Sequence, residues 1–107
     1  MSTYFVRLEV QNMTPPEYKL LNANLAAMKF YRFFLSKNKS YWQFPVGLYR
    51  TDDESLASVS AKLSAVLKRM HKTGEYVIIA SGGMTTLGLK PITREQAVLL
   101  NTGENLT

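Results

Sequence analysis

The sequence predicts an α+β fold in a single domain. The prediction rests on an alternating apolar segment near the N-terminus, two helix-periodic segments with capping residues, and aromatic or β-branched runs between them. A chain of 107 residues has the size of one domain, and its hydrophobic share of 46% is ordinary for a globular protein. We expect residues 1–100 to form this domain and residues 101–107 to form a polar C-terminal tail.

The first two predicted elements are a strand and a helix. From Tyr4 to Val10 every second residue is apolar, which is the period of a strand, and the other face carries Phe5, Arg7 and Glu9. The run Thr14-Pro15-Pro16-Glu17 has the form of a capping box with proline in the first turn, so a helix should begin there. The apolar stripe of this helix consists of Tyr18, Leu21, Leu25 and Met28.

A β-hairpin is expected next. Residues Phe30 to Leu35 are rich in aromatics, Ser36 to Ser40 form a polar connection, and Tyr41 to Tyr49 resume the strand-like pattern. Pro45 lacks a backbone donor and Gly47 follows it, so we expect a bulge or an edge position in the second arm.

The second helix is expected to begin at Thr51-Asp52-Asp53-Glu54, where a capping residue and three acids would suit the helix dipole. Basic residues crowd its expected end, and Gly74 provides a stop signal. Its apolar stripe consists of Leu56, Val59, Leu63, Val66, Leu67 and Met70.

The C-terminal third predicts smaller elements. Tyr76 to Ser81 indicates a strand, Gly82-Gly83 a turn and Thr85 to Leu89 a short extra strand, and a helix from Thr93 to Leu100 is capped by Thr93 with Gln96. The order β-α-β-β-α-β is that of a ferredoxin-like two-layer sandwich, here with a short extra C-terminal strand and helix. Two helices should cover one face of the sheet.

The net charge of +5 is localised. No acid occurs between Tyr18 and Thr51, whereas the rest of the chain has seven Lys and Arg against eight Asp and Glu. The positive potential should therefore lie on the first helix and the hairpin, where an anionic partner such as RNA would bind. The basic residues of this segment are Lys19, Lys29, Arg32, Lys37, Lys39 and Arg50.

Strand alternation predicts a shared sheet face opposite the helices that carries Phe5, Arg7, Arg32, Phe34, Tyr41, Gln43 and Tyr49. Such a face suits single-stranded nucleic acid, because bases stack on aromatic rings while cations hold phosphates. The candidate nucleic-acid-binding residues are Arg7, Arg32, Lys37, Lys39, Tyr41 and Arg50. The alternative is a dimer or protein interface built on Phe5, Phe34 and Tyr49.

Catalytic signals are sparse, and the catalytic residues remain unknown. The chain has no cysteine and one histidine, which excludes a thiol nucleophile, a disulfide framework and most zinc sites. His71 could act as a general base in metal-free RNA cleavage, but its place at a helix end favours a capping role. Glu9 and the acids of residues 52–54 could in principle bind a metal, but the latter are better explained as helix-start charges. We expect no metal and no cofactor.

Several short runs resemble a known family: Phe44-Pro45 to Tyr49, a helix ending at Thr73-Gly74, Tyr76-Val77-Ile78-Ile79, and Gly88-Leu89-Lys90. They resemble a family of small bacterial ferredoxin-like proteins that is similar in topology to the GhoS endoribonuclease antitoxin and to the CRISPR-adaptation nucleases of the VapD type. These nucleases carry an aspartate at the end of the first strand, where this chain has Glu9-Val10-Gln11-Asn12. The resemblance thus implies the fold and an RNA-directed role, while metal-dependent cleavage is not expected.

The expected function is that of a cytoplasmic nucleic-acid-binding protein, an antitoxin-type RNA binder or a metal-independent endoribonuclease, which forms a homodimer. The alternative is a non-catalytic interaction module, such as a phage or mobile-element inhibitor of a bacterial defence complex, whose basic half docks on an acidic partner. No membrane association is expected, because apolar runs such as Tyr76 to Ala80 are too short to span a bilayer.

Overall fold

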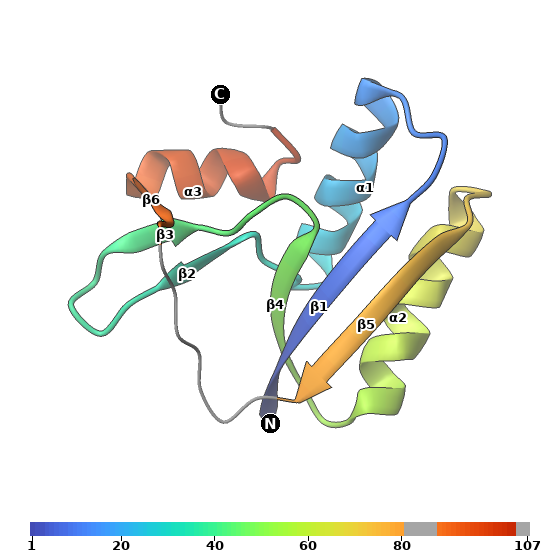
Figure 1. Cartoon of the computed structure of the whole chain (residues 1–107), viewed down its shortest axis with the longest axis horizontal. Helices are drawn as coiled ribbons and strands as arrows, with labels where there is room; N and C mark the ends of the chain where they lie inside the picture. The colour runs from blue at the N-terminus through green and yellow to red at the C-terminus, as the bar shows by residue number, and fades with distance from the viewer. Residues whose placement is uncertain (81–87, 105–107) are drawn as a thin grey trace.

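The central strand β1 (Ser2–Val10) lies between β4 (Leu48–Asp53) and β5 (Gly74–Ala80) in a three-stranded antiparallel sheet (Figure 1). In this computed structural model, which describes residues 1–80 and 88–104, β4 and β5 both run antiparallel to β1. Helix α2 (Leu56–Arg69) connects β4 to β5. Because β4 and β5 are both antiparallel to β1, they are parallel to each other, and β1 lies between them. We call this the central sheet.

One face of the central sheet packs against α1 (Pro15–Ala27) and α2. The alternation of β1 places its apolar residues toward the helices, whereas Arg7 and Glu9 of the same strand are exposed. Side chains of both helices that are almost inaccessible to solvent complete this core. The core residues contributed by these elements include Tyr4, Val6, Leu8, Val10, Leu21, Leu25, Val59, Leu63, Val66 and Leu67.

The helix starts were predicted correctly for α1 and α3 (Arg94–Asn101) but not for α2. Thr14 and Thr93 form the expected capping boxes with Glu17 and Gln96. Residues 51–53, expected at the start of the second helix, instead continue β4, and Ser55 caps α2 by accepting a hydrogen bond from the backbone of Ser58. The physical reason is that residues 49, 51 and 53 alternate into the core, so the strand pattern extends through the acidic run.

All three helices end in a Schellman motif, in which the residue after the C-cap has a positive φ. Lys29, His71 and Gly103 occupy this position with φ values of 67°, 56° and 90°. In α2, the backbone N–H of His71 donates to Lys68 O, and that of Lys72 donates to Leu67 O. Helix α2 therefore ends before Gly74, the expected stop signal, which begins β5.

A second three-stranded antiparallel sheet, which we call the hairpin sheet, extends from the β4 side of the central sheet (Figure 1). It consists of β2 (Phe33–Leu35), β3 (Tyr41–Gln43) and β6 (Lys90–Ile92). The expected fold would place the hairpin and β4 in one sheet, but a single bridge between Tyr31 and Arg50 joins the first arm to β4.

The expected second arm, residues 41–49, is divided between the two sheets. Pro45 and Gly47 lie at the division, and Gly47 has a φ of 88° that disfavours side chains. A Cβ at Gly47 would also lie 2.9 Å from the backbone oxygen of Leu8. Phe44 packs where the sheets meet, edge-to-face against Phe5 and stacked on Phe34.

Helix α3 packs beside α1 and against the hairpin sheet. Residues 101–104, the beginning of the expected polar tail, are held there: Gly103 is buried against α1, and Glu104 forms a 2.6 Å ion pair with Lys19. The expected turn at residues 82–83 and residues 85–87 of the expected extra strand lie outside the described residues. No helix in the described part of the chain is long and apolar enough to cross a membrane.

Candidate nucleic-acid interface

Three aromatic rings lie in a row along the hairpin sheet, and we call Tyr31, Phe33 and Tyr41 the aromatic row. The ring centroids of Tyr31 and Phe33 are 5.6 Å apart, and those of Phe33 and Tyr41 are 5.9 Å apart. All three side chains are partly exposed. Adjacent tilted rings of this kind form a continuous apolar strip from which planar groups can be stacked.

The strand register decides which aromatics share this face. Phe33 is paired with Gln43 and Leu35 with Tyr41, so these four residues lie on one face of the hairpin sheet. Phe34 is paired with Trp42 on the opposite face. The expectation that Phe34 and Tyr41 share a face was therefore wrong. Alternation could not settle the phase, because aromatic side chains occur at both phases of residues 31–34.

The turn between β2 and β3 presents the two lysines Lys37 and Lys39 to solvent. The turn is closed by hydrogen bonds from the backbone N–H of Ser36 to Ser40 O, 2.9 Å, and from that of Lys39 to Ser36 O, 2.9 Å. The Asn38 side chain accepts from the Ser40 N–H at 3.2 Å and contacts Ser36 Oγ. This ordered turn therefore fixes two expected phosphate-binding cations at the end of the strands that carry the aromatic row.

Two further cations lie near the aromatic row. Arg50 is bridged to Tyr31 through both backbone hydrogen bonds, and its guanidinium lies 3.7 Å from the carboxylate of Asp52. Lys90, which was not among the expected nucleic-acid-binding residues, is exposed and paired with Gln43, on the face of Phe33. No sequence signal could have found Lys90, because its position depends on pairing between strands about fifty residues apart.

Arg32 does not lie on the open face where it was expected. Its side chain is half-buried and donates to the backbone oxygens of Leu100, 2.8 Å, and Glu104, 2.6 Å, at the C-terminal end of α3. Burial lowers the pKa of its guanidinium. A cation at a helix C-terminus is favoured by the helix dipole, so the structure gives Arg32 a role in holding α3.

Tyr49, expected in an exposed interface, is buried with 4% of its surface accessible. Its hydroxyl donates to Asn22 Oδ1 of α1 at 2.6 Å. Burial raises the pKa of Tyr49 to about 12, with the positive charge of Arg32 opposing the shift. The expected location was wrong because residues 49, 51 and 53 of β4 face the helices, and Tyr49 belongs to the core.

Arg7 and Phe5 are on the face of β1 away from the helices, as expected. Arg7 is exposed and donates from Nη1 to Val46 O at 2.6 Å. Phe5 is partly exposed and contacts Phe44, as described above. Both residues belong to the central sheet, so the hairpin sheet presents only part of the expected basic-aromatic set: Lys37, Lys39 and Tyr41, with Arg50 beside Tyr31.

Candidate metal-binding carboxylates do not converge. Asp52 is paired with Thr3 near one end of β1, whereas Glu9 is six residues further along, or about 20 Å. Asp53 is buried and forms a 2.8 Å ion pair with Lys62, whose hydrogen bond, together with that of the Glu54 backbone, lowers the pKa of Asp53 to about 2. Within residues 1–80 and 88–104, no group of three or more His, Asp or Glu could hold a metal ion.

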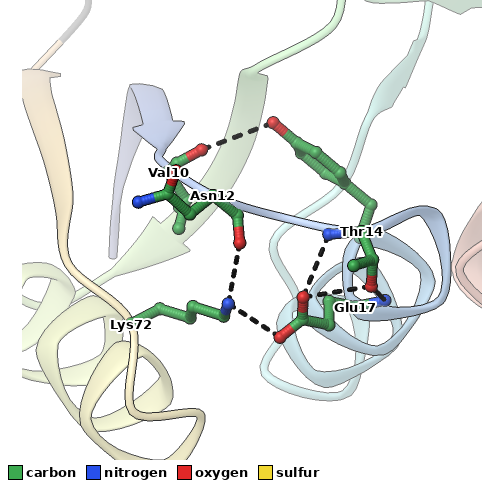
Figure 2. A network of polar contacts seen from close by, with 6 residues as sticks. Val10, Asn12, Thr14, Glu17 and Lys72 are labelled. Atoms are coloured by element: carbon green, nitrogen blue, oxygen red, sulfur yellow. Dashed lines mark hydrogen bonds and ion pairs between the residues drawn. The ribbon is translucent and has the colours of Figure 1, made fainter.

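The charges at the start of α1 form a structural clamp, shown in Figure 2. Lys72 Nζ, from the segment after α2, donates to Glu17 Oε2 and to Asn12 O, both at 2.8 Å. Glu17 also accepts from the backbone and the hydroxyl of Thr14. These bonds, the one to Lys72 above all, lower the pKa of Glu17 to about 2. Lys72 thus ties the end of α2 to the start of α1.

His71 is exposed at the position after the C-cap of α2, next to this clamp. Its backbone N–H completes the Schellman motif by donating to Lys68 O.

Comparison with known proteins gives no match. No protein-family model, no curated protein and no solved structure matches the chain.

Proposed function

We propose that the protein binds single-stranded RNA on the hairpin sheet, with bases stacked on the aromatic row and phosphates held by Lys37 and Lys39. The observation that carries this proposal is the uninterrupted row of partly exposed rings next to an ordered turn with two exposed lysines. Arg50 and Lys90 add positive charge beside the row. Among these cations only Arg50 has a described carboxylate partner.

The chemistry of the surface fits a single strand better than a duplex. Stacking of a base on an aromatic side chain contributes about 1 to 3 kcal/mol and needs unpaired bases. A row of three rings would take two or three bases, and flexible lysines can follow the phosphates between them. We expect weak sequence preference, because every base has a π-face.

A matched pair of substitutions tests the proposal. Phe33→Leu removes a ring from the aromatic row, whereas Phe34→Leu removes a ring of similar burial from the opposite face. We expect Phe33→Leu to weaken binding of a fluorescein-labelled twelve-nucleotide single-stranded RNA at least about fivefold in fluorescence anisotropy, from one lost stacking contact. Phe34→Leu should leave affinity within twofold. Equal affinity of both variants would contradict the proposal, provided that their melting temperatures agree.

The lysines are tested by the salt dependence of the same assay. For single strands, the slope of log K against log salt changes by about 0.7 for each phosphate that is neutralised. The double variant Lys37→Gln/Lys39→Gln should therefore reduce the slope by about 1.4. The control Lys68→Gln/Arg69→Gln removes two exposed charges of α2 and should leave the slope unchanged. An unchanged slope in the first variant would exclude the turn as the phosphate site.

The finer topology and biological role are also proposals. The insertion of β1 between two parallel strands connected by α2 supports a ferredoxin-like topology, with the first arm of the hairpin displaced into the hairpin sheet. We propose an antitoxin-type RNA binder and assign no catalytic residue. Incubation of the protein with its bound RNA, followed by gel electrophoresis, distinguishes binding from metal-independent cleavage, because only the latter shortens the RNA.

A second candidate function is a non-catalytic protein-interaction module, favoured by the edge strand β5. Val77 and Ile79 on β5 are 59% and 56% exposed on the face away from the helices. An edge strand with exposed apolar residues can pair with another strand, including β5 of a second copy in a homodimer. Light scattering with and without Ile79→Lys tests self-association. A nuclease-resistant protein partner in a pull-down from the native host would favour the module over RNA binding.

A further inference from the structure

An open cavity of about 500 Å³ lies at the end of the aromatic row that Tyr31 forms. Its wall is built from the C-terminal end of α1, the beginning of the chain, the end of β4 and Lys62 of α2. Pockets of this size bind small organic ligands, so the cavity has room for one nucleotide. Because the Tyr31 side chain belongs to both, the cavity is continuous with the proposed RNA-binding surface.

Backbone hydrogen bonds hold Tyr31 and Lys29 in the wall of this cavity. The Tyr31 N–H donates to Arg50 O at 2.8 Å, and the Arg50 N–H donates to Tyr31 O at 2.9 Å. Lys29 follows the C-cap of α1 with a φ of 67°, and its N–H donates to Ala26 O at 2.9 Å. Among the described residues, no carboxylate forms an ion pair with the exposed Lys29 side chain. The wall therefore offers a ring on which a base can stack and an ammonium group for a phosphate.

Asp52 adds an accessible carboxylate to the same wall. Its Oδ1 accepts a hydrogen bond from the Thr3 hydroxyl at 2.7 Å and lies 3.7 Å from Arg50 Nη2, which together orient the carboxylate. The Asp52 side chain is 51% exposed, and in the part of the chain that the structure describes no donor contacts its Oδ2. The neighbouring Asp53 also lines the cavity, but its side chain is buried and bound to Lys62 at 2.8 Å. Asp52 is therefore the carboxylate that a ligand in this cavity would contact.

A carboxylate distinguishes the four bases by their Watson–Crick edges, which unpaired bases in single-stranded RNA leave open. An ionised carboxylate only accepts hydrogen bonds, through two neighbouring oxygens. Guanine presents two neighbouring donors on this edge, N1–H and the N2 amino group. Adenine and cytosine each place a ring acceptor beside a single amino group, and uracil has one N–H between two carbonyl oxygens. A carboxylate in the cavity therefore favours guanine over the other three bases.

We propose that this cavity binds one guanine nucleotide of the single-stranded RNA, with the base stacked on Tyr31, its N1–H and N2 amino group donating to Asp52, and a phosphate at Lys29. The inference rests on the proposed function and adds a base preference that the aromatic row alone does not provide. An arginine side chain of a protein partner would also match the carboxylate, but the ammonium group of Lys29 repels a cation and attracts a phosphate.

Three fluorescein-labelled RNAs test the base preference in fluorescence anisotropy. Each is a run of twelve uridines in which one central position is replaced by guanosine, adenosine or inosine. Adenosine controls for the stacking of a purine, and inosine differs from guanosine only by the missing N2 amino group. We expect the guanosine RNA to bind at least about tenfold more tightly than the adenosine RNA, because adenine forgoes the hydrogen bonds to a charged acceptor. The affinity of the inosine RNA should lie between the two.

A matched pair of substitutions locates the preference in the cavity. Asp52→Asn should bring the affinities for the guanosine and adenosine RNAs to within about threefold, because a neutral amide offers one acceptor and one donor. The control Glu54→Gln removes an exposed carboxylate that does not line the cavity, and it should keep the full preference. The ratio of the two affinities is measured within each variant, so a general effect of charge on RNA binding cancels.

The outcomes separate this inference from the proposed function. Equal binding of the guanosine and adenosine RNAs by the unmodified protein, or an unchanged preference in Asp52→Asn, overturns the guanine site and leaves RNA binding on the aromatic row in place. Absence of binding to all three RNAs overturns the proposed function itself, and the guanine site with it.

Discussion

The Arg32 side chain should stabilise the packing of α3 against the hairpin, and Arg32→Met tests this role. The substitution keeps the apolar length of the side chain but removes the hydrogen bonds to Leu100 O, 2.8 Å, and Glu104 O, 2.6 Å. Each hydrogen bond from a charged donor contributes about 1.5 to 3 kcal/mol. Since the side chain is only half-buried, we take the lower value and expect Arg32→Met to reduce the free energy of unfolding by about 3 kcal/mol.

The measurement is urea unfolding followed by circular dichroism, with hydrogen exchange of α3 as a local readout. The matched control is Lys19→Gln, which removes the exposed ion pair with Glu104 in the same region. Exposed ion pairs contribute about 0 to 1 kcal/mol, so the control should change stability little. A cost for Arg32→Met no larger than that of Lys19→Gln, with unchanged exchange in α3, would refute the reasoning.

Three further predictions concern the conformation and the titration of single residues. His71→Gly should raise the free energy of unfolding by about 1 kcal/mol in urea titrations, because glycine adopts the φ of 56° without strain; a loss of stability would mean that the His71 side chain has an unrecognised structural role. The pKa of Asp53 is lowered to about 2 by its contact with Lys62, so the charged carboxylate stabilises the fold above the unfolded pKa, and this stabilisation is lost as the pH falls toward 2. Asp53→Asn removes the titrating group. In thermal melts, the variant should therefore lose less stability between pH 4 and pH 2 than the unmodified protein does. An acid limb identical to that of the unmodified protein would speak against this ion pair. The pKa of Tyr49 is raised to about 12, so its contribution to stability is retained below pH 10 and is lost as the pH rises from 10 to 12. Tyr49→Phe should reduce this alkaline loss of stability. At neutral pH the same substitution should lower the free energy of unfolding by about 1 to 3 kcal/mol, because it leaves the Asn22 oxygen without its hydrogen bond.

Local features of the fold followed from short stretches of sequence. The capping boxes at Thr14 and Thr93 satisfy backbone donors within four residues, so their chemistry is complete in the sequence itself. The alternation of β1 and the apolar stripe of α2 likewise identify eight of the twelve buried residues of the core between the central sheet and the helices. The α+β class, the three helices and the exposed lysines of the hairpin turn were predictable for this reason.

The division into two sheets was decided by tertiary structure. Pro45 and Gly47 indicated an irregularity in the second arm, but a bulge, an edge and a change of sheet all give the same local signal. The sequence was equally ambiguous about which side of the sheet each of residues 31–34 faces, because aromatic side chains occur on both sides and either set could be buried. Pairing of Phe33 with Gln43 chose the phase, and this placed Tyr31 and Phe33, rather than Arg32 and Phe34, beside Tyr41.

The sequence by itself determined where α1 and α3 begin, which faces of the helices are apolar and which segment carries the positive charge, because these properties depend on neighbouring residues. Only the tertiary structure determined that Arg32 binds α3 and that Tyr49 and Asn22 meet in the core. It also placed Arg7 in the wall of the same cavity as Tyr49 and Asn22. The contacts of Arg32 with Leu100 and Glu104 join groups that are 68 and 72 positions apart along the chain. Their contacts arise from the packing of α1 and α3 against two sheets, and no local pattern of residues encodes that packing.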